Sequence, residues 1–321
     1  MGGIDIWTDH IYHEEVDSII KLHQKKFLGD VKDMATNSAF GLAFHRGLGV
    51  SLYPSSSTPL TKYLDASSIA DFSQTAYAKP NFAVVGNGVD PTELSKWVGE
   101  FFTDAPAQPS QQLDKAQSKY FGGEERISHA SGNAMVLAFP GSSSVTGSSY
   151  KPEISVLAAL LGGESTIKWS PGFSLLSKAS AKYPGANFQT KSEIFSDAGL
   201  LTITLTGASK DIRGAASSVV DTLKQIASGV SKEEFQKAKA LAKFKELEFG
   251  QNINAGIELT GAGLVHGDKA YQIDEVAQKI DSVSEDAVAK AAKACLEQRA
   301  SVSSVGDLYV LPYAEEIGLK I

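Results

Sequence analysis

Val230-Ser-Lys-Glu-Glu-Phe235 starts a helical run whose pattern the chain has already used about 220 residues earlier, at Thr8-Asp-His-Ile-Tyr-His-Glu-Glu-Val16. From Val16 to Gly86 is 70 residues, and from Phe235 to Gly306 is 71. Solenoid repeats are much shorter, roughly 20 to 50 residues. A period as long as a domain therefore indicates a duplicated domain.

Each copy contains the same succession of elements. A first helical run is followed by a polar or glycine-rich stretch, a second helical run and a short strand. The second helical runs are Ala66–Tyr77 and Ser284–Leu296, and the strands are Asn81–Val85 and Ser301–Val305. The pattern predicts two units of one fold.

The two copies differ in what precedes them. About 110 residues of strand and helix pattern, beginning near Tyr120, precede Phe235, whereas only 15 residues precede Val16. By analogy with Arg126–Pro140 and Leu200–Thr206, the front half absent from the first copy is rich in strands. A sheet that lacks strands has an unpaired edge. We therefore expect either a fragment or shortened gene model, or a second chain that covers the gap.

Composition shifts divide the chain into three parts. Ala105–Gln112 is poor in apolar residues and carries two prolines, as linkers do. Just before it, Asp90-Pro-Thr-Glu93 is typical of a helix start, and this helix is expected to run to about Phe102. We predict an incomplete first domain over residues 1–104, a linker over 105–118 and a second domain over 119–321.

The second domain mixes strands and helices without a strict strand-helix-strand rhythm. The expected elements are a strand at Ala134–Phe139, a buried helix from Pro152 that stops at Gly162-Gly163, a strand at Gly199–Thr206, and helices at Ala215–Ile226 and Ser231–Glu248, the last with a capping box of Ser231 and Glu234. This order predicts an α+β fold in which helices pack on one mixed sheet per unit.

Bulk properties exclude several classes of function. The 321 residues are 42% hydrophobic and 21% charged, with a net charge of −7, which argues against a nucleic-acid partner. No apolar stretch has the length of a membrane span, and Met1–Trp7 shows no targeting pattern. The single cysteine, Cys295, excludes an internal disulfide, and we expect a buried, reduced thiol.

No recognisable set of catalytic residues is present. His10, His13, Glu14 and Glu15 form the most metal-like cluster, but neither H-E-x-x-H nor H-x-x-E-H occurs there. A solvated, charged helix start is the favoured interpretation. For the other histidines we expect surface or structural roles, with His266 in a loop over Gly263–Gly267; the isolated ones are His45 and His129.

Two glycine-containing segments need separate interpretations. Gly86-Asn-Gly-Val-Asp-Pro91 has proline at the third glycine position of a dinucleotide loop, so a simple strand-to-helix turn is favoured over nucleotide binding. Leu161-Gly-Gly-Glu-Ser-Thr-Ile-Lys-Trp-Ser-Pro-Gly172 is the most unusual stretch. It could admit another backbone or an extended peptide, or it could be a helix C-cap with an irregular connection. Both interpretations stay open.

Four segments together carry a family resemblance. They are Tyr120-Phe-Gly-Gly-Glu124, Leu160–Lys178, Gly47–Pro59 and Asn81-Phe-Ala-Val-Val-Gly86. With them the chain resembles the pitrilysin-type metallopeptidase family from about Thr8 to its C-terminus, and within it the fungal core proteins of the mitochondrial respiratory chain. The resemblance implies two similar α+β domains joined by a linker, each a mixed sheet packed with helices.

The resemblance assigns no catalytic, cofactor-binding or metal-binding residue to this chain. Active family members carry H-x-x-E-H near the start of the first domain, in a portion that this sequence does not contain, and a more distal glutamate. The position of that glutamate is His23 here. His23 without partner ligands makes a metal site improbable, so the resemblance implies an inactive member with no cofactor.

The implied function is that of a scaffold. The core proteins of ubiquinol–cytochrome c reductase are peripheral to the inner mitochondrial membrane on its matrix side, where they pair with a second core subunit and support the cytochrome b and cytochrome c1 subunits. One alternative is an α-type subunit of the mitochondrial processing peptidase, although Trp169-Ser-Pro171 interrupts a loop expected to be richer in glycine there. Another is a truncated product that joins no complex.

Overall fold

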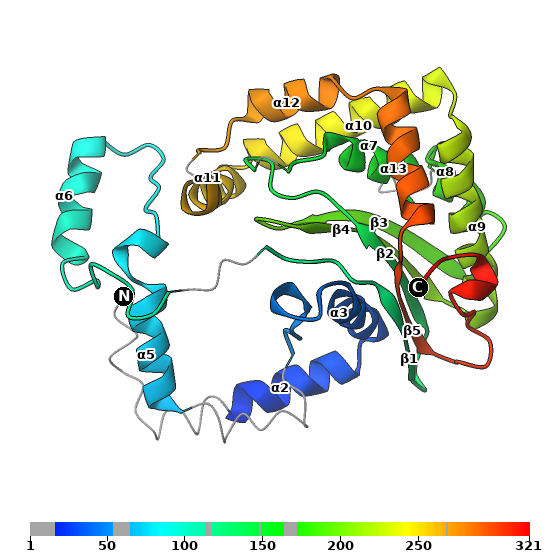
Figure 1. Ribbon diagram of the computed structural model, residues 1–321, viewed down its shortest axis with the longest axis horizontal. Helices are drawn as coiled ribbons and strands as arrows, with labels where there is room; N and C mark the ends of the chain where they lie inside the picture. Colours follow the sequence, from blue (N-terminus) through cyan, green and yellow to red (C-terminus); the bar gives the residue numbers. More distant parts are fainter. Residues whose placement is uncertain (1–16, 54–64, 113–116, 148, 164–171, 268) are drawn as a thin grey trace. The chain divides into compact units, whose positions relative to one another are not determined.

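The computed structural model describes residues 17–53, 65–112, 117–147, 149–163, 172–267 and 269–321 (Figure 1). By their contacts the residues form two compact units. The first unit contains residues 1–26, 53–116 and 250–271, and the second contains residues 27–52, 117–249 and 272–321. Each unit therefore draws on segments that are distant in the sequence.

The second unit is built on one five-stranded mixed sheet. The strands are β1 (Gly123–Ser128), β2 (Ala134–Pro140), β3 (Ala186–Ile194), β4 (Gly199–Gly207) and β5 (Ser301–Gly306), in the order β1-β5-β2-β4-β3. The last strand in the sequence, β5, lies between β1, to which it is parallel, and β2, to which it is antiparallel. The predicted strands in this unit and the α+β class are confirmed.

Helices cover both faces of this sheet, which explains the apolar sequence of its central strands. Every residue of Ala134–Phe139 is fully buried. One layer of helices comprises α7 (Pro152–Leu161), α8 (Leu175–Ser180), α9 (Ser209–Ser228), α10 (Lys232–Gln251), α12 (Ile273–Asp281) and α13 (Glu285–Glu297). A single helix, α3 (Val31–Phe44), packs on the opposite face, against β5 and β2 (Figure 1). Strands buried on both faces lose the polar alternation of a half-exposed sheet.

Small residues allow α3 to approach the sheet closely. Ala35, Ala39 and Ala43 recur every fourth residue, so they share one helix face, and all three are fully buried. The opposing strand β5 carries the equally buried Ser301 and Ser303. Sequence reasoning missed this helix, because an alanine-rich stripe has weak hydrophobic contrast.

Polar contacts also hold α3 on the sheet. The Lys32 ammonium donates to the Gln189 amide oxygen of β3 at 2.7 Å. The Ser38 hydroxyl donates to the Glu125 carboxylate of β1. Because β1 and β3 are the two edge strands, these contacts tie the helix across the full width of the sheet.

The first unit is made of helices in its described part. Its helices are α5 (Ala66–Ala76), α6 (Pro91–Phe101), α11 (Ile253–Gly267) and most of α2 (Asp17–Leu28), with the short 3₁₀ turn η3 (Lys79–Asn81). The second unit has two such turns, η2 (Gly47–Gly49) and η4 (Glu315–Ile317). The predicted starts of α5 and α6 are confirmed, and the Asp90 carboxylate accepts from the Thr92 and Glu93 amides at 2.9 and 3.1 Å.

The strand predicted at Asn81–Val85 is wrong. Asn81 ends the turn η3, and residues 82–86 follow without pairing to any strand among the described residues. The backbone at Phe82 is extended, with φ −136° and ψ 156°. A strand is defined by ladder hydrogen bonds to a neighbour, and extended sequence alone does not supply one.

Part of the expected linker packs on α5. The Lys79 amide donates to the Pro106 carbonyl at 2.9 Å, and the Thr75 and Ser110 hydroxyls lie 2.6 Å apart. These contacts give residues 105–112 a fixed course along the first unit.

Candidate functional site at the glycine-rich loop

The glycine-rich segment leaves α7 through two unusual backbone positions. Gly162 caps α7 with φ 63° and ψ −123°, and its amide donates to the Ala158 carbonyl at 2.8 Å. Gly163 has φ 138° and forms an isolated antiparallel bridge with Gln189 of the edge strand β3. The predicted stop of the buried helix at this glycine pair is confirmed, whereas residues 164–171 lie outside the described part of the chain.

Neither glycine tolerates a side chain. A Cβ at Gly162 would overlap the Ser174 side chain, and a Cβ at Gly163 would overlap the Phe188 carbonyl oxygen. Both positive φ values also disfavour residues with a Cβ. The glycine pair therefore has a sufficient structural reason, which favours the C-cap interpretation of these two residues.

Two serines join the two ends of the segment. The Ser174 hydroxyl oxygen accepts from the Gly163 amide at 3.1 Å and from the Ser177 amide at 3.3 Å, which makes it the N-cap of α8. The Ser177 hydroxyl donates to the Gly163 carbonyl. The point where the chain leaves α7 and the point where it enters α8 are thus fixed together.

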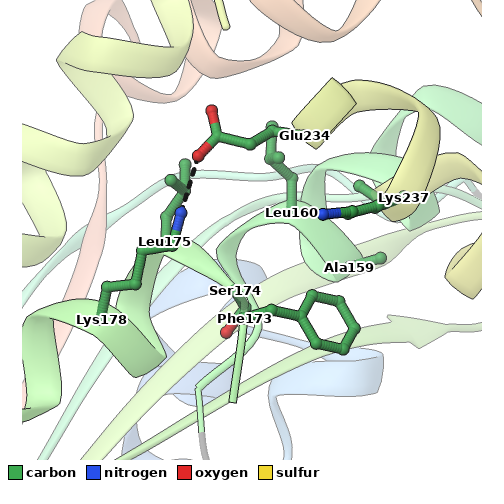
Figure 2. Close-up of a pocket in the computed structure, with 9 residues that line it drawn as sticks. Ala159, Leu160, Phe173, Ser174, Leu175, Lys178, Glu234 and Lys237 are labelled. Atoms are coloured by element: carbon green, nitrogen blue, oxygen red, sulfur yellow. Dashed lines mark hydrogen bonds and ion pairs between the residues drawn. The ribbon is translucent and has the colours of Figure 1, made fainter. Parts of the chain in front are cut away.

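A small cavity of about 130 Å³ lies beside this junction (Figure 2). Its polar group is an ion pair between Lys178 of α8 and Glu234 of α10, with 2.8 Å between Nζ and Oε1. The Lys178 hydrogen bond lowers the pKa of Glu234, so this carboxylate stays ionised and paired. The predicted capping box is confirmed, because the Glu234 amide donates to the Ser231 hydroxyl at 3.2 Å.

The cavity has no catalytic machinery among its described residues. Its other lining side chains are mainly apolar, and Phe173 is 53% exposed at its side. An ion pair whose charges neutralise each other supplies neither a free base nor a nucleophile. The geometry suits packing and contact with a partner.

The histidines are dispersed. His23 is exposed on α2, and His129 contacts the Leu28 carbonyl at 2.9 Å. His45 ends α3 with a positive φ of 58° and stacks on Phe121 at 4.0 Å between ring centroids. The cluster of His10, His13, Glu14 and Glu15 lies outside the described residues. Within the described ranges, no three His, Cys, Asp or Glu side chains are grouped to hold a metal ion.

The loop predicted around His266 is wrong. Gly263–Gly267 is the last part of α11, so His266 lies in the final turn of a helix. Glycine costs a helix only about 1 kcal/mol relative to alanine, so the surrounding apolar residues can hold the helical conformation.

The Tyr120–Glu124 motif is structural. The Tyr120 hydroxyl donates to the Ala138 carbonyl at 3.2 Å and accepts from the Ser301 hydroxyl at 3.0 Å. Burial raises the pKa of Tyr120 to about 12, so the phenol stays protonated and keeps both bonds. The motif therefore joins β1 to the centre of the sheet.

Sequence reasoning missed a buried arginine next to this motif. The Arg126 guanidinium donates to the carbonyls of Leu308, Leu311 and Pro312 at 2.8 to 2.9 Å. It also stacks on the Tyr313 ring, with 3.9 Å between the guanidinium carbon and the ring centroid. These contacts fix the segment that follows β5. No motif could have identified Arg126, because its partners are backbone atoms about 185 residues away.

The prediction for Cys295 is confirmed. This cysteine lies on α13, is 3% exposed and forms no disulfide. Burial raises the pKa of its thiol to about 12, which keeps it protonated and unreactive. Among the described helices, none combines the length and apolar character needed to cross a lipid bilayer.

Comparison with known proteins places the chain in a family. The family model for the Peptidase M16 inactive domain matches residues 63–241. The chain is 46% identical over 316 residues to mitochondrial cytochrome b-c1 complex subunit 2 of Neurospora crassa, covering 98% of this chain and 68% of the relative. It is 34% identical to the protein of the same name from Cryptococcus neoformans, covering 89% of this chain and 64% of the relative.

More distant matches agree with this placement. The α-2 subunit of the mitochondrial processing peptidase of Dictyostelium discoideum is 25% identical over 78% of this chain and 56% of that relative. The structure of complex III2 from Candida albicans with bound Inz-5 contains a chain that matches with a TM-score of 0.78 and 15% identity, covering 98% of this chain and 75% of that one. At this identity the structural match shows the fold alone.

The chain spans about two thirds of the length of the curated fungal relatives. The resemblance expected from the sequence, and its narrower form as a fungal core protein 2, are confirmed by these relatives. The chain therefore belongs to the M16, or pitrilysin-type, peptidase family, among the relatives of mitochondrial cytochrome b-c1 complex subunit 2.

Proposed function

We propose that this chain is a non-catalytic core subunit of the mitochondrial ubiquinol–cytochrome c reductase, or bc1, complex. The observation that carries the proposal is the 46% identity to Neurospora crassa subunit 2 over 98% of the chain. The match to the inactive domain of the M16 family supports a role without peptidase activity. The chain supplies no redox or zinc chemistry in this proposal and acts by supporting assembly and stability.

The proposed location is the matrix side of the mitochondrial inner membrane, peripheral to the bilayer. The proposed partners are a second core subunit, in a heterodimer, and the cytochrome b and cytochrome c1 subunits. A rigid sheet covered by helices on both faces and a serine-fixed loop junction suit a scaffold, because such surfaces need little reorganisation on binding.

We also propose that the domain boundaries follow the duplication. Residues 1–104 would be the C-terminal portion of a first peptidase-like domain, residues 105–118 the linker and residues 119–321 the second domain. The compact units cut across these boundaries, because α3 packs with the sheet of the second unit and α11 belongs to the first unit. Helices exchanged between duplicated domains reconcile the two divisions.

Affinity purification from mitochondria tests the function. A tagged copy of the chain is expressed in a Neurospora crassa strain that lacks its own subunit 2, and membranes are solubilised in digitonin. We expect the chain to be recovered with cytochromes b and c1, detected by their haem absorbance, and to restore ubiquinol–cytochrome c reductase activity. Recovery with a zinc-bearing peptidase subunit would support the processing-peptidase alternative, and recovery alone would contradict both.

A further inference from the structure

The first unit contains an apolar groove that its described residues do not cover. The groove has a volume of about 540 Å³ and lies between residues 79–84 and α6. Its apolar lining comes from Phe82 and Val84 on one side, and from Leu94, Val98 and Phe102 on the other. No residue of α6 is buried, although this helix carries apolar residues at the spacing of a core-facing stripe.

The internal repeat shows what such a region contains when it is complete. In the second copy the strand after the helix is β5, which is buried along its whole length and paired on both sides, to β1 and to β2. The corresponding segment in the first copy, residues 82–86, follows α5 at a similar distance and is paired with no described strand. Its side chains are correspondingly open, with Val84 42% exposed.

The helices of the two copies show the same contrast. In the second copy α13 buries Val288, Ala292 and Cys295 against neighbouring helices. In the first copy α5 leaves Phe72 63% exposed, and on α6 Phe101 is 69% exposed. Large aromatic side chains repeatedly exposed on one unit mark a surface made for a partner.

We propose that residues 82–86 and the adjoining groove accept β-strands from a polypeptide that supplies the front half of the first repeat. The incoming strands would pair with both edges of this segment, as β1 and β2 pair with β5, and their apolar side chains would fill the groove. Strand addition of this kind gains affinity from main-chain hydrogen bonds and specificity from alternate side chains. The relatives contain such a polypeptide, since about a third of their length has no counterpart in this chain.

A second copy of the chain fits the groove less well. The two neighbours of β5 differ in direction, one parallel and one antiparallel, and in sequence. A copy of residues 82–86 could provide only one strand of one kind. A lipid could fill the groove but could not satisfy the unpaired backbone amides.

The direct test is complementation in solution. The part of Neurospora crassa subunit 2 that this chain does not match is produced as a separate polypeptide and titrated into the full chain. Trp97, which is 45% exposed on α6, reports on the region when the other two tryptophans are changed in a Trp7→Phe and Trp169→Phe variant. We expect its fluorescence emission to shift to the blue and amide hydrogen exchange over residues 82–86 to slow at least about tenfold.

A matched pair of variants makes the test specific. Val84→Glu places a charge in the groove, and we expect it to weaken binding at least about tenfold. Val50→Glu changes another exposed valine, 63% exposed and outside the groove, and should leave binding unchanged. Both side chains are exposed, so neither change should unfold the chain.

Three results would overturn the proposal. They are absence of both the emission shift and the added protection, equal binding by the Val84→Glu and Val50→Glu variants, and a dimer of the chain alone that Val84→Glu dissociates. The last would identify a second copy as the occupant. None of these results bears on recovery of the chain with the cytochromes, so the two proposals fail separately.

Discussion

The two copies of the repeat in this molecule share local sequence signals and differ in burial. In the second copy, β5 lies inside a sheet and α13 packs against α7 and α9, whereas in the first copy residues 82–86 have no described strand partner. The helices form in both copies, because caps and local periodicity act within one segment. The strand forms only where neighbours exist, which separates what a segment encodes from what its surroundings supply.

The largest expected difference between the copies concerns two phenylalanines. Phe139→Ala in β2 removes a fully buried ring, and we expect it to lower the free energy of unfolding by about 3 to 5 kcal/mol. Phe101→Ala in α6 removes a ring that is 69% exposed and should change stability by less than about 0.5 kcal/mol. Urea denaturation followed by circular dichroism measures both.

Limited proteolysis checks the same contrast without a substitution. The second unit should resist cleavage and should retain the α3 helix, which packs on its sheet. Cleavage within α6 should come first, because none of its residues is buried. Loss of the sheet before α6 would contradict the comparison.

Two glycines with positive φ provide the next contrast. Gly163→Ala would force a Cβ into the Phe188 carbonyl, and we expect a loss of about 2 to 4 kcal/mol. Gly88→Ala in the first unit meets open space at φ 73°, so only the backbone strain of about 1 kcal/mol should remain. Equal losses in thermal denaturation would show that the junction beside α7 is not closely packed.

The N-caps of the two equivalent helices should respond differently to pH. Ser284 caps α13 through its hydroxyl, and Ser284→Ala should cost about 1 kcal/mol at any pH. Asp65 caps α5, and hydrogen bonds from Ser68 and Ser67 lower the pKa of its carboxyl. The stability that Asp65 contributes is therefore present above its unfolded pKa and is lost as the pH falls through the lower folded pKa.

A cap exchange isolates this effect. In an Asp65→Ser variant, the helix content of α5 should become independent of pH in the acid range, as monitored by hydrogen exchange of its amides. Retention of the acid transition in that variant would assign it to another group.

The smallest expected effect is at a carboxyl group on α10. Burial raises the pKa of Glu246, so the folded chain holds this proton more tightly than the unfolded chain. Its contribution is favourable below the unfolded pKa and is lost as the pH rises through the folded pKa. In urea denaturation at neutral pH, Glu246→Gln should therefore stabilise the protein, while Glu248→Gln, on the exposed side of the same helix, should not.

Much of the fold could be predicted from the sequence, and the exceptions share a cause. The caps at Asp90 and Ser231, the apolar strand at Ala134–Phe139 and the glycine stop after α7 are local signals, and the structure contains them. The helix α3 was missed because its alanine face gains meaning only against the serines of β5. The strand at Asn81–Val85 was predicted wrongly because its partners lie outside the segment.

The candidate site was less predictable than the fold. The sequence identified the glycine-rich segment as unusual but left two interpretations open, and only the contacts of Gly162 and Gly163 with Ser174 and Phe188 decided between them for those residues. Arg126 left no sequence signal, because its partners are carbonyl groups that any residue provides. Distant backbone partners are the information that a single sequence does not contain.

The position of β5 between β1 and β2 has a consequence for biosynthesis. The strand comes from the last 21 residues of the chain, so a nascent polypeptide on the ribosome cannot close this core until translation is almost finished. Until then the apolar strand β2 lacks one neighbour, and newly made protein must be guarded against self-association during that interval. Such a chain depends on chaperones for a delay that its own topology creates.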